Sequence, residues 1–381
     1  MPERLCVRLR SRHQPHYEIV INSGALGSLG AEARRVLLPA ARRVAVISNE
    51  KVFSLYGETA MRSLGAAGFN PVRWLMNEGE RHKSLRTLER ALEFLSAARL
   101  ERSDAVVALG GGVVGDLAGF AAATYMRGLA FLQVPTTLLA QIDASVGGKT
   151  GVNLRSGKNL AGAFHQPRAV IVDTAVLKSL PRRELTAGWC EAVKQGAAGS
   201  RPLFYKTIGL LRREGIESAD DSGLARLIAA QCAFKARVVI QDEREEIART
   251  DHRSRRILNF GHTTAHALEA VTNFRRFRHG EAVGYGMLVA GELSVGLGLL
   301  DASELKLLRA AVRLCGRLPR ADDLDRELIR GAISHDKKRV GGHTKWVLLE
   351  RIGRATLVDE REITPRLLRA SLRAAFSDSV S

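Results

Sequence analysis

The stretch Gly110-Gly111-Gly112-Val113-Val114-Gly115-Asp116 decides the fold of the first half of this chain. It follows the apolar run 104–109, which is typical of a buried parallel strand. The glycines let the backbone turn sharply and approach a ligand, and the small apolar residues 117–123 predict a helix. A strand, a glycine turn and a helix N-terminus together present free N–H groups to a pyrophosphate. The spacing is not G-x-G-x-x-G, so a tight connection without a ligand stays the alternative.

Strands and helices alternate around this stretch through the first half of the chain. We predict strands at 17–22, 43–48, 72–76, 105–109, 130–134 and 169–172. The clearest helix is 85–100, where leucines recur every three or four residues after Ser84, a predicted N-cap. After residue 180 helical patterns dominate, at 184–198, 223–239, 262–271, 281–295 and 302–314, with a β-like pair at 345–349 and 355–358. The pattern predicts an α/β fold with a Rossmann-like domain over 1–180 and a mainly α-helical domain over 181–381.

Composition narrows the class of protein. The 381 residues carry a net charge of +18, but the basic residues are scattered and only 5% of residues are aromatic. Nucleic-acid binding is therefore not expected, whereas a cationic surface attracts anionic metabolites. No apolar run reaches the roughly 18 residues that span a membrane, and the N-terminus lacks the apolar core of a signal peptide. The four cysteines form no C-x-x-C pair, so we expect a cytoplasmic protein with free thiols.

Two histidine-containing segments and one acidic segment predict a metal site. His262 and His266 are four residues apart on a predicted helix, and His279 follows in a Gly- and Glu-rich segment. Glu191 and Lys194 share a helix face. Each residue alone would more simply be a core histidine or an intrahelical ion pair. Together they predict a site with two histidines and one carboxylate, and spacing leaves open whether His262 or His266 is the second ligand.

The segment Gly147-Gly148-Lys149-Thr150 matches the end of the P-loop motif, but position 143 is Asp where that motif needs Gly. We therefore exclude a P-loop NTPase. Backbone N–H groups beside Lys149, with Lys158 and Asn159 nearby, still suit an anionic group.

These motifs, taken in order, resemble the 3-dehydroquinate synthases of the sugar-phosphate cyclase family. The matching segments are 79–83, 110–116, 125–128, 133–153, 191–194, 259–262 and 279–281. The run 133–153 is the most specific of them. One departure is Ala265, where the family has a second glycine in Gly-His-Thr-x-Gly-His.

The resemblance implies a Rossmann-like domain and a helical domain with the active site between them, and it assigns residues to three groups. NAD would be bound by Gly111, Gly112 and Asp116, with Glu80, Lys83, Thr136, Thr137, Lys149 and Lys158 alongside. A divalent metal, zinc or cobalt, would be held by Glu191, His262 and His279. The substrate would contact Asp143, Lys149, Asn159, Lys194, Lys235, Arg255, Asn259, His266 and Lys345, with Arg127 reaching in from the other subunit of a homodimer. Because the segment 245–254 looks longer than usual, Arg256 could replace Arg255.

The implied substrate is 3-deoxy-D-arabino-heptulosonate 7-phosphate, and the implied product is 3-dehydroquinate of the shikimate pathway, which leads to aromatic amino acids. The implied steps are oxidation of a ring hydroxyl by NAD, loss of phosphate, re-reduction, ring opening and aldol closure. Three alternatives stand beside this one: another sugar-phosphate cyclase, a metal-dependent alcohol or polyol dehydrogenase, and a basic protein associated with nucleic acid. Asn259 and His266, which related cyclases tend to replace, favour the shikimate enzyme, and the run 146–153 argues against a dehydrogenase.

Overall fold

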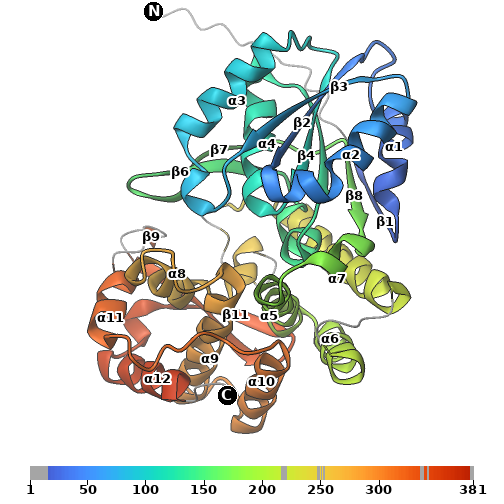
Figure 1. The fold of residues 1–381 in the computed structure, drawn as a ribbon. Coiled ribbons are helices and arrows are strands. Elements are labelled where there is room, and N and C mark those ends of the chain that lie inside the picture. Colours follow the sequence, from blue (N-terminus) through green and yellow to red (C-terminus); the bar gives the residue numbers. More distant parts are fainter. Residues whose placement is uncertain are drawn as a thin grey trace, which may run out of the picture.

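The structure is a computed structural model, and it describes residues 16–215, 221–246, 249, 251, 254–334, 339–340 and 343–377. Figure 1 shows two parts, a sheet with helices above and a mainly helical part below. The predicted division at residue 180 falls between η5 (Thr174–Ser179) and α5 (Arg182–Gly199). Separate domains stay a prediction, because α7 (Asp221–Gln241) of the second half packs on β1 and η5 of the first.

All six predicted strands form one parallel sheet, in the order β1-β8-β5-β4-β2-β3. They are β1 (Glu18–Asn22), β2 (Arg43–Asn49), β3 (Asn70–Met76), β4 (Ala105–Gly110), β5 (Ala130–Pro135) and β8 (Ala169–Asp173). Successive side chains point to opposite faces of a strand. Val44 and Val46 accordingly join the core on one face, while Ala45 and Ile47 join the core on the other. Both faces are apolar, as a parallel sheet covered by helices requires.

Four helices cover the two faces of this sheet (Figure 1). They are α1 (Leu29–Val36) and α2 (Glu50–Ala66) on one face and α3 (Leu85–Ala97) and α4 (Gly112–Thr124) on the other. Ser84 caps α3 as predicted, since its side chain accepts a hydrogen bond from the Thr87 backbone N–H. Helix α4 begins at Gly112, five residues before the predicted start. The glycine turn therefore leads directly from the strand into the helix.

The order of the strands places this turn at a ligand-binding position. The chain runs from β2 outward to β3 and then returns to the other side of β2 to form β4. Ligands of open parallel sheets bind where the strand order reverses, at the carboxyl ends of the strands. Gly110 ends β4 at this point. A Cβ atom on Gly111 would lie 3.0 Å from Cγ2 of Thr137, so a side chain there would crowd the turn.

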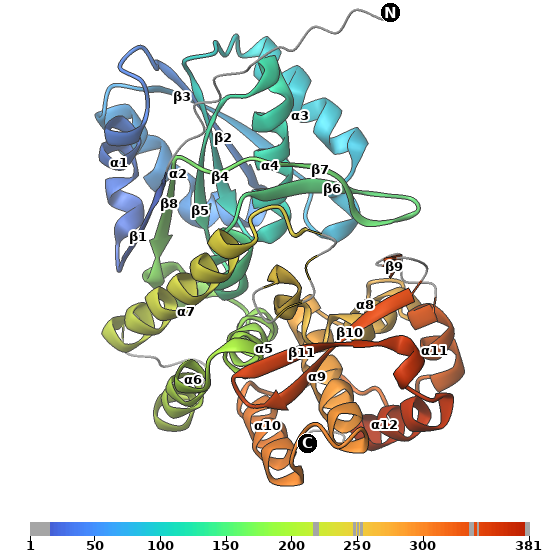
Figure 2. The same ribbon diagram turned by 180° about the vertical axis from the view of Figure 1, so that it is seen from behind.

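A β-hairpin between β5 and β8 was not predicted. It consists of β6 (Lys149–Leu154) and β7 (Gly157–Phe164), which pair antiparallel. Its first strand packs on α4 and α3. In Figure 1 and Figure 2 the hairpin lies on the side of the sheet part that faces α8. The hairpin carries three of the predicted site residues, Lys149, Lys158 and Asn159.

The second half is mainly helical, as predicted. Its helices are α5, α6 (Arg201–Glu214), α7, α8 (His262–Val271), α9 (His279–Gly296), α10 (Ala302–Leu314), α11 (Arg326–Ser334) and α12 (Pro365–Ser377). The predicted β-pair is β10 (His343–Arg351) and β11 (Arg354–Asp359), which β9 (Arg339–Val340) extends. Helix α9 is central, because α5, α8, α10, α12 and β10 all pack on it (Figure 2).

Short helical turns occur in both halves of the chain. They are η1 (Ala25–Ser28), η2 (Glu80–His82), η3 (Tyr125–Arg127), η4 (Ala140–Ala144), η5, η6 (Arg255–Asn259) and η7 (Glu360–Glu362). Within the described residues, no helix is both long and apolar enough to cross a membrane.

Replacing Gly286 by Ala is expected to destabilise the protein, because α8 and α9 pack backbone to backbone there. A Cβ atom at Gly286 would lie 1.9 Å from the carbonyl oxygen of Gly261, the residue before His262. Overpacking of this kind lowers the free energy of unfolding by about 1–3 kcal/mol. Gly209, in the middle of α6, is the matched control: nothing lies within 4 Å of its Cβ position, so alanine should stabilise the helix slightly. Urea unfolding of both variants checks this, and equal effects would contradict it.

Candidate active site

Three side chains from different helices meet in the helical part. Glu191 lies in the middle of α5, and His262 and His279 are the first residues of α8 and α9. The Oε1 atom of Glu191 is 3.6 Å from Nε2 of His279 and 4.0 Å from Nε2 of His262. Helices α5 and α9 can come this close because Gly280 has no side chain: a Cβ atom there would lie 1.9 Å from the Ala187 carbonyl oxygen.

The chemistry of this trio fits a divalent cation. Oε1 of Glu191 is buried and accepts no hydrogen bond from the described residues. The Nδ1 atom of His262 is 3.2 Å from the Phe260 carbonyl oxygen, which leaves Nε2 facing Glu191. One ligand atom from each of the three residues lies within 4.8 Å of the others. Two imidazoles and a carboxylate are a donor set that zinc uses in catalytic sites, where a further position is open to substrate or water.

His266 lies one helical turn beyond His262. Its ring centroid is 5.6 Å from that of His262 and 6.1 Å from that of His279. The structure groups His266 with Glu269 and His279 rather than with Glu191. Between the two histidines that spacing left open, the geometry therefore favours His262 as the partner of Glu191.

Glu269, which sequence reasoning missed, lies on the opposite side of the His279 ring from Glu191. Its Oε1 atom is 3.4 Å from Nδ1 of His279 and 3.0 Å from Nζ of Lys158. Burial alone would raise the pKa of Glu269, but His279 and Lys158 lower it to about 2. The signal in the sequence was its spacing of seven residues from His262 and three from His266, which puts it near that face of α8.

Asp143, Lys194 and Lys235 lie beside the trio. The Lys194 ammonium is 2.6 Å from Oε2 of Glu191, one turn away on α5. Lys235, on α7, forms an ion pair of 3.0 Å with Oδ1 of Asp143, which also accepts a hydrogen bond from the Gln195 amide at 3.1 Å. Burial alone would raise the pKa of Asp143, but the ammonium groups of Lys235 and Lys194 hold it well below its usual range.

A second group forms around Glu245, another residue that sequence reasoning missed. Glu245 pairs with Lys149 of the hairpin and accepts a hydrogen bond of 3.4 Å from the Asn259 amide. The Arg255 guanidinium is buried and donates to the Gly147 carbonyl oxygen at 3.3 Å. Arg255 therefore reaches the segment that carries Lys149.

The predicted cofactor residues gather where the strand order reverses. Lys83 pairs with Asp116 of α4 and donates to Oδ1 of Asn159 at 2.5 Å. Burial raises the pKa of Asp116, and Lys83 opposes that shift. Lys158 lies 3.9 Å from Oε1 of Glu80.

Gly111, Gly112, Thr136 and Thr137 line the turn between β4, β5 and α4. The Thr136 N–H donates to the Gly110 carbonyl oxygen at 3.0 Å, and the Thr137 hydroxyl accepts from the Ala140 N–H at 3.1 Å. The first bond joins the end of β4 to the residue after β5, and the second is local to the start of η4.

Two predicted residues are not brought into these groups by any described contact. Lys345, on β10, forms an ion pair of 2.9 Å with Asp359. Arg127 is exposed in the turn after α4, where Met126 and Arg127 have φ angles of +48° and +68°. Their predicted substrate contacts stay predictions.

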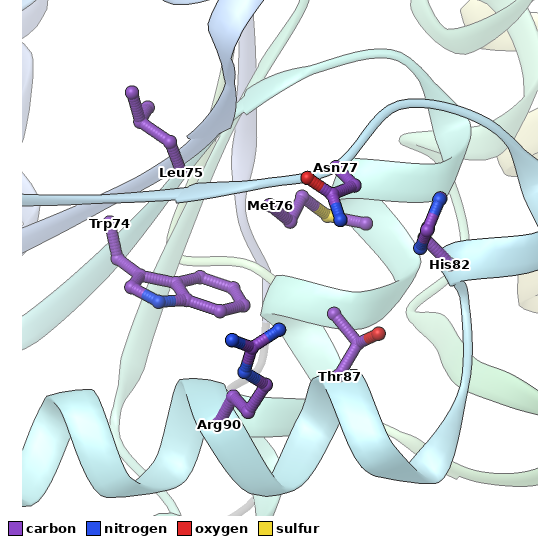
Figure 3. A pocket seen from close by; sticks show the side chains of 7 residues that line it. All are labelled: Trp74, Leu75, Met76, Asn77, His82, Thr87 and Arg90. Carbon is purple, nitrogen blue, oxygen red and sulfur yellow. The ribbon is translucent and has the colours of Figure 1, made fainter.

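A surface cavity lies between the end of β3 and α3, next to the turn that carries Glu80 and Lys83 (Figure 3). Its lining residues are Trp74, Leu75, Met76, Asn77, His82, Thr87 and Arg90. None of the predicted site residues is among them.

Comparison with known proteins identifies the family. Residues 73–187 match the 3-dehydroquinate synthase N-terminal family, and residues 188–339 match the C-terminal family. The chain belongs to the 3-dehydroquinate synthase family. A 3-dehydroquinate synthase of Pelotomaculum thermopropionicum is 46% identical over 343 residues, which cover 90% of this chain and 90% of that relative. The resemblance recognised in the sequence is thereby confirmed.

Solved structures of related cyclases share the fold. A 2-epi-5-epi-valiolone synthase from Streptomyces hygroscopicus, with NAD+ and Zn2+ bound, is 27% identical with a TM-score of 0.84, over 97% of this chain and 99% of that one. A 2-deoxy-scyllo-inosose synthase complexed with carbaglucose-6-phosphate, NAD+ and Co2+ is 26% identical with a TM-score of 0.79, over 93% and 96% of the two chains. The α/β fold with a helical second half, predicted for a 3-dehydroquinate synthase, is therefore confirmed.

Proposed function

We infer that this chain converts 3-deoxy-D-arabino-heptulosonate 7-phosphate to 3-dehydroquinate and phosphate. It is an NAD- and divalent-metal-dependent lyase of the shikimate pathway, on the path to chorismate and the aromatic amino acids. The observation that carries the inference is the orphaned Oε1 of Glu191 between two imidazoles, with the Lys194 ammonium at the other carboxylate oxygen, in a chain of this family. Incubation with the heptulosonate phosphate, NAD and zinc, with phosphate and product followed together, tests it. A product other than 3-dehydroquinate would favour another cyclase.

We assign the metal to Glu191, His262 and His279, and NAD to the turn at Gly111 and Gly112. When bound, NAD accepts and returns a hydride and the cation stabilises negative charge on the reacting oxygen. The residues of the chain bind and orient the substrate. Lys194 and Lys235 can hold its anionic groups beside Glu191, and Lys149 and Arg255 can do so from the hairpin side.

Asp143 and His266 are proposed to contact the sugar hydroxyls. Asp143 stays ionised and so accepts hydrogen bonds. His266 is next to the metal trio without facing Glu191, as a group that contacts substrate rather than metal would be. The substrate's own phosphate can serve as the base for its elimination, which requires no further enzymic base.

Lys149→Gln is expected to lower kcat/KM by roughly one to two decades. The change removes a charge-assisted contact to the substrate, worth about 1.5–3 kcal/mol. Steady-state kinetics with the phosphate substrate measures it. Lys51→Gln, an exposed lysine on α2, is the matched control and should leave the kinetics unchanged. Near-normal kinetics for Lys149→Gln would contradict the role.

We further propose a homodimer in which Arg127 of each subunit reaches the active site of the partner subunit. It is supported by the exposure of Arg127 on the turn after α4. Light scattering measures the mass in solution. Mixing inactive Arg127→Ala with inactive Lys194→Met should restore part of the activity, because a mixed dimer has one intact site. No recovery from a mixed dimer would contradict the proposal.

A cytoplasmic location is likewise proposed. It is supported by Cys190, Cys232 and Cys315, which are buried free thiols, as in a reducing compartment. Cell fractionation tests it.

A further inference from the structure

His279 has carboxylates at both of its ring nitrogens. Nε2 is 3.6 Å from Oε1 of Glu191, and Nδ1 is 3.4 Å from Oε1 of Glu269. Glu269 is 3% exposed, and its second oxygen, Oε2, accepts no hydrogen bond from the described residues. The carboxylate is thus held behind the ring, on the side away from Glu191.

The same atoms could be read as a second cation site made of His266, Glu269 and His279. Two observations argue against it. The Lys158 ammonium already lies 3.0 Å from Oε1 of Glu269 and 4.5 Å from the ring centroid of Phe274, so a fixed positive charge stands at that carboxylate. A second cation would also require the His279 ring to bind through both nitrogens, since Nε2 faces Glu191.

We propose that Glu269 is a positioning residue that orients His279 for metal binding. The inference rests on the proposed metal site. A carboxylate that accepts the Nδ1–H of an imidazole fixes its tautomer and its orientation, and it makes the opposite nitrogen a better ligand. Lys158, from the hairpin, pairs with the same carboxylate oxygen, Oε1 of Glu269.

Glu269→Gln tests the proposal, because glutamine keeps the shape of the side chain and removes its charge. The apo proteins are titrated with Zn2+ or Co2+ against a chelator of known affinity, without substrate. We expect the variant to bind the metal about 10–100-fold more weakly. The visible spectrum of the Co2+ form should also change, which a merely structural role would not cause. Glu292→Gln, a glutamate of α9 paired with Arg309, is the matched control and should bind the metal normally.

A second variant, Lys158→Met, removes the ion pair between the hairpin and Glu269 of α8. It shows whether the loss of metal in Glu269→Gln comes from the contact with His279 or from this ion pair. This variant leaves Glu269 beside His279, so it should keep the Co2+ spectrum and lose less than about threefold in metal affinity. Thermal unfolding of the apo proteins shows whether each variant is folded.

Three results would overturn the proposal. The first is metal affinity within about twofold of the wild type in Glu269→Gln, with an unchanged spectrum. The second is a Lys158→Met variant that behaves like Glu269→Gln. The third is a wild-type protein that binds two metal ions per chain and loses one in Glu269→Gln. If instead Glu191→Gln binds metal like the wild type, the proposed site itself is wrong, and the role of Glu269 falls with it.

Discussion

Glu191→Gln is expected to remove the divalent metal and to lower kcat/KM by about a thousandfold or more. The Glu191 carboxylate is the anionic member of the trio, and without it only the two imidazoles remain. A bound cation contributes several kcal/mol of charge stabilisation in a transition state, and about 4 kcal/mol corresponds to about a thousandfold in rate. Metal content per chain and steady-state kinetics measure the two effects together.

Glu184→Gln is the matched control, because Glu184 lies on the same helix and pairs at 2.9 Å with Arg278 rather than with the trio. It should keep both metal and activity. His266→Ala should keep the metal and still lose turnover. Full metal content in Glu191→Gln, or loss of metal in His266→Ala, would show that the ligands have been assigned wrongly.

Phosphate is expected to appear over many turnovers without any matching growth of NADH absorbance. The reaction oxidises the substrate and reduces it again before release, so NAD is required but not consumed. Exhaustive removal of NAD should stop phosphate release, and an amount far below that of the substrate should restore it. An enzyme that bound NAD at the same glycine turn but acted only as a dehydrogenase would instead accumulate NADH. One NADH formed per substrate consumed would therefore contradict cyclase chemistry.

Much of the fold could be predicted because its signals are local. The six strands of the sheet are short apolar runs, as expected for strands buried on both faces, and leucines at helical spacing with a capping Ser84 mark α3. The hairpin β6–β7 could not be predicted in the same way. Most residues of β7 are exposed or half-buried, and it contains two glycines, so neither alternation nor strand propensity marks it.

The candidate site could be predicted in part, since the residue types of a metal trio are visible in a sequence. The choice between His262 and His266 could not be made from spacing, because both lie on one helix face. It depends on where α5 places Glu191, which is a matter of tertiary packing. Glu245 and Glu269 were missed for the same reason, as each acts on residues that are distant in the sequence.

The four lysines expected to hold the substrate are each already paired with a carboxylate of the chain. The pairs are Lys149–Glu245, Lys194–Glu191, Lys235–Asp143 and Lys345–Asp359. An anionic sugar therefore meets lysines whose charge is already partly neutralised, and it competes with an internal counter-ion at each of them. The net affinity is then smaller than the number of charged contacts suggests, because each new contact competes with an old one. A stray inorganic anion, which can replace only one partner at a time, competes poorly with a substrate that engages several lysines at once.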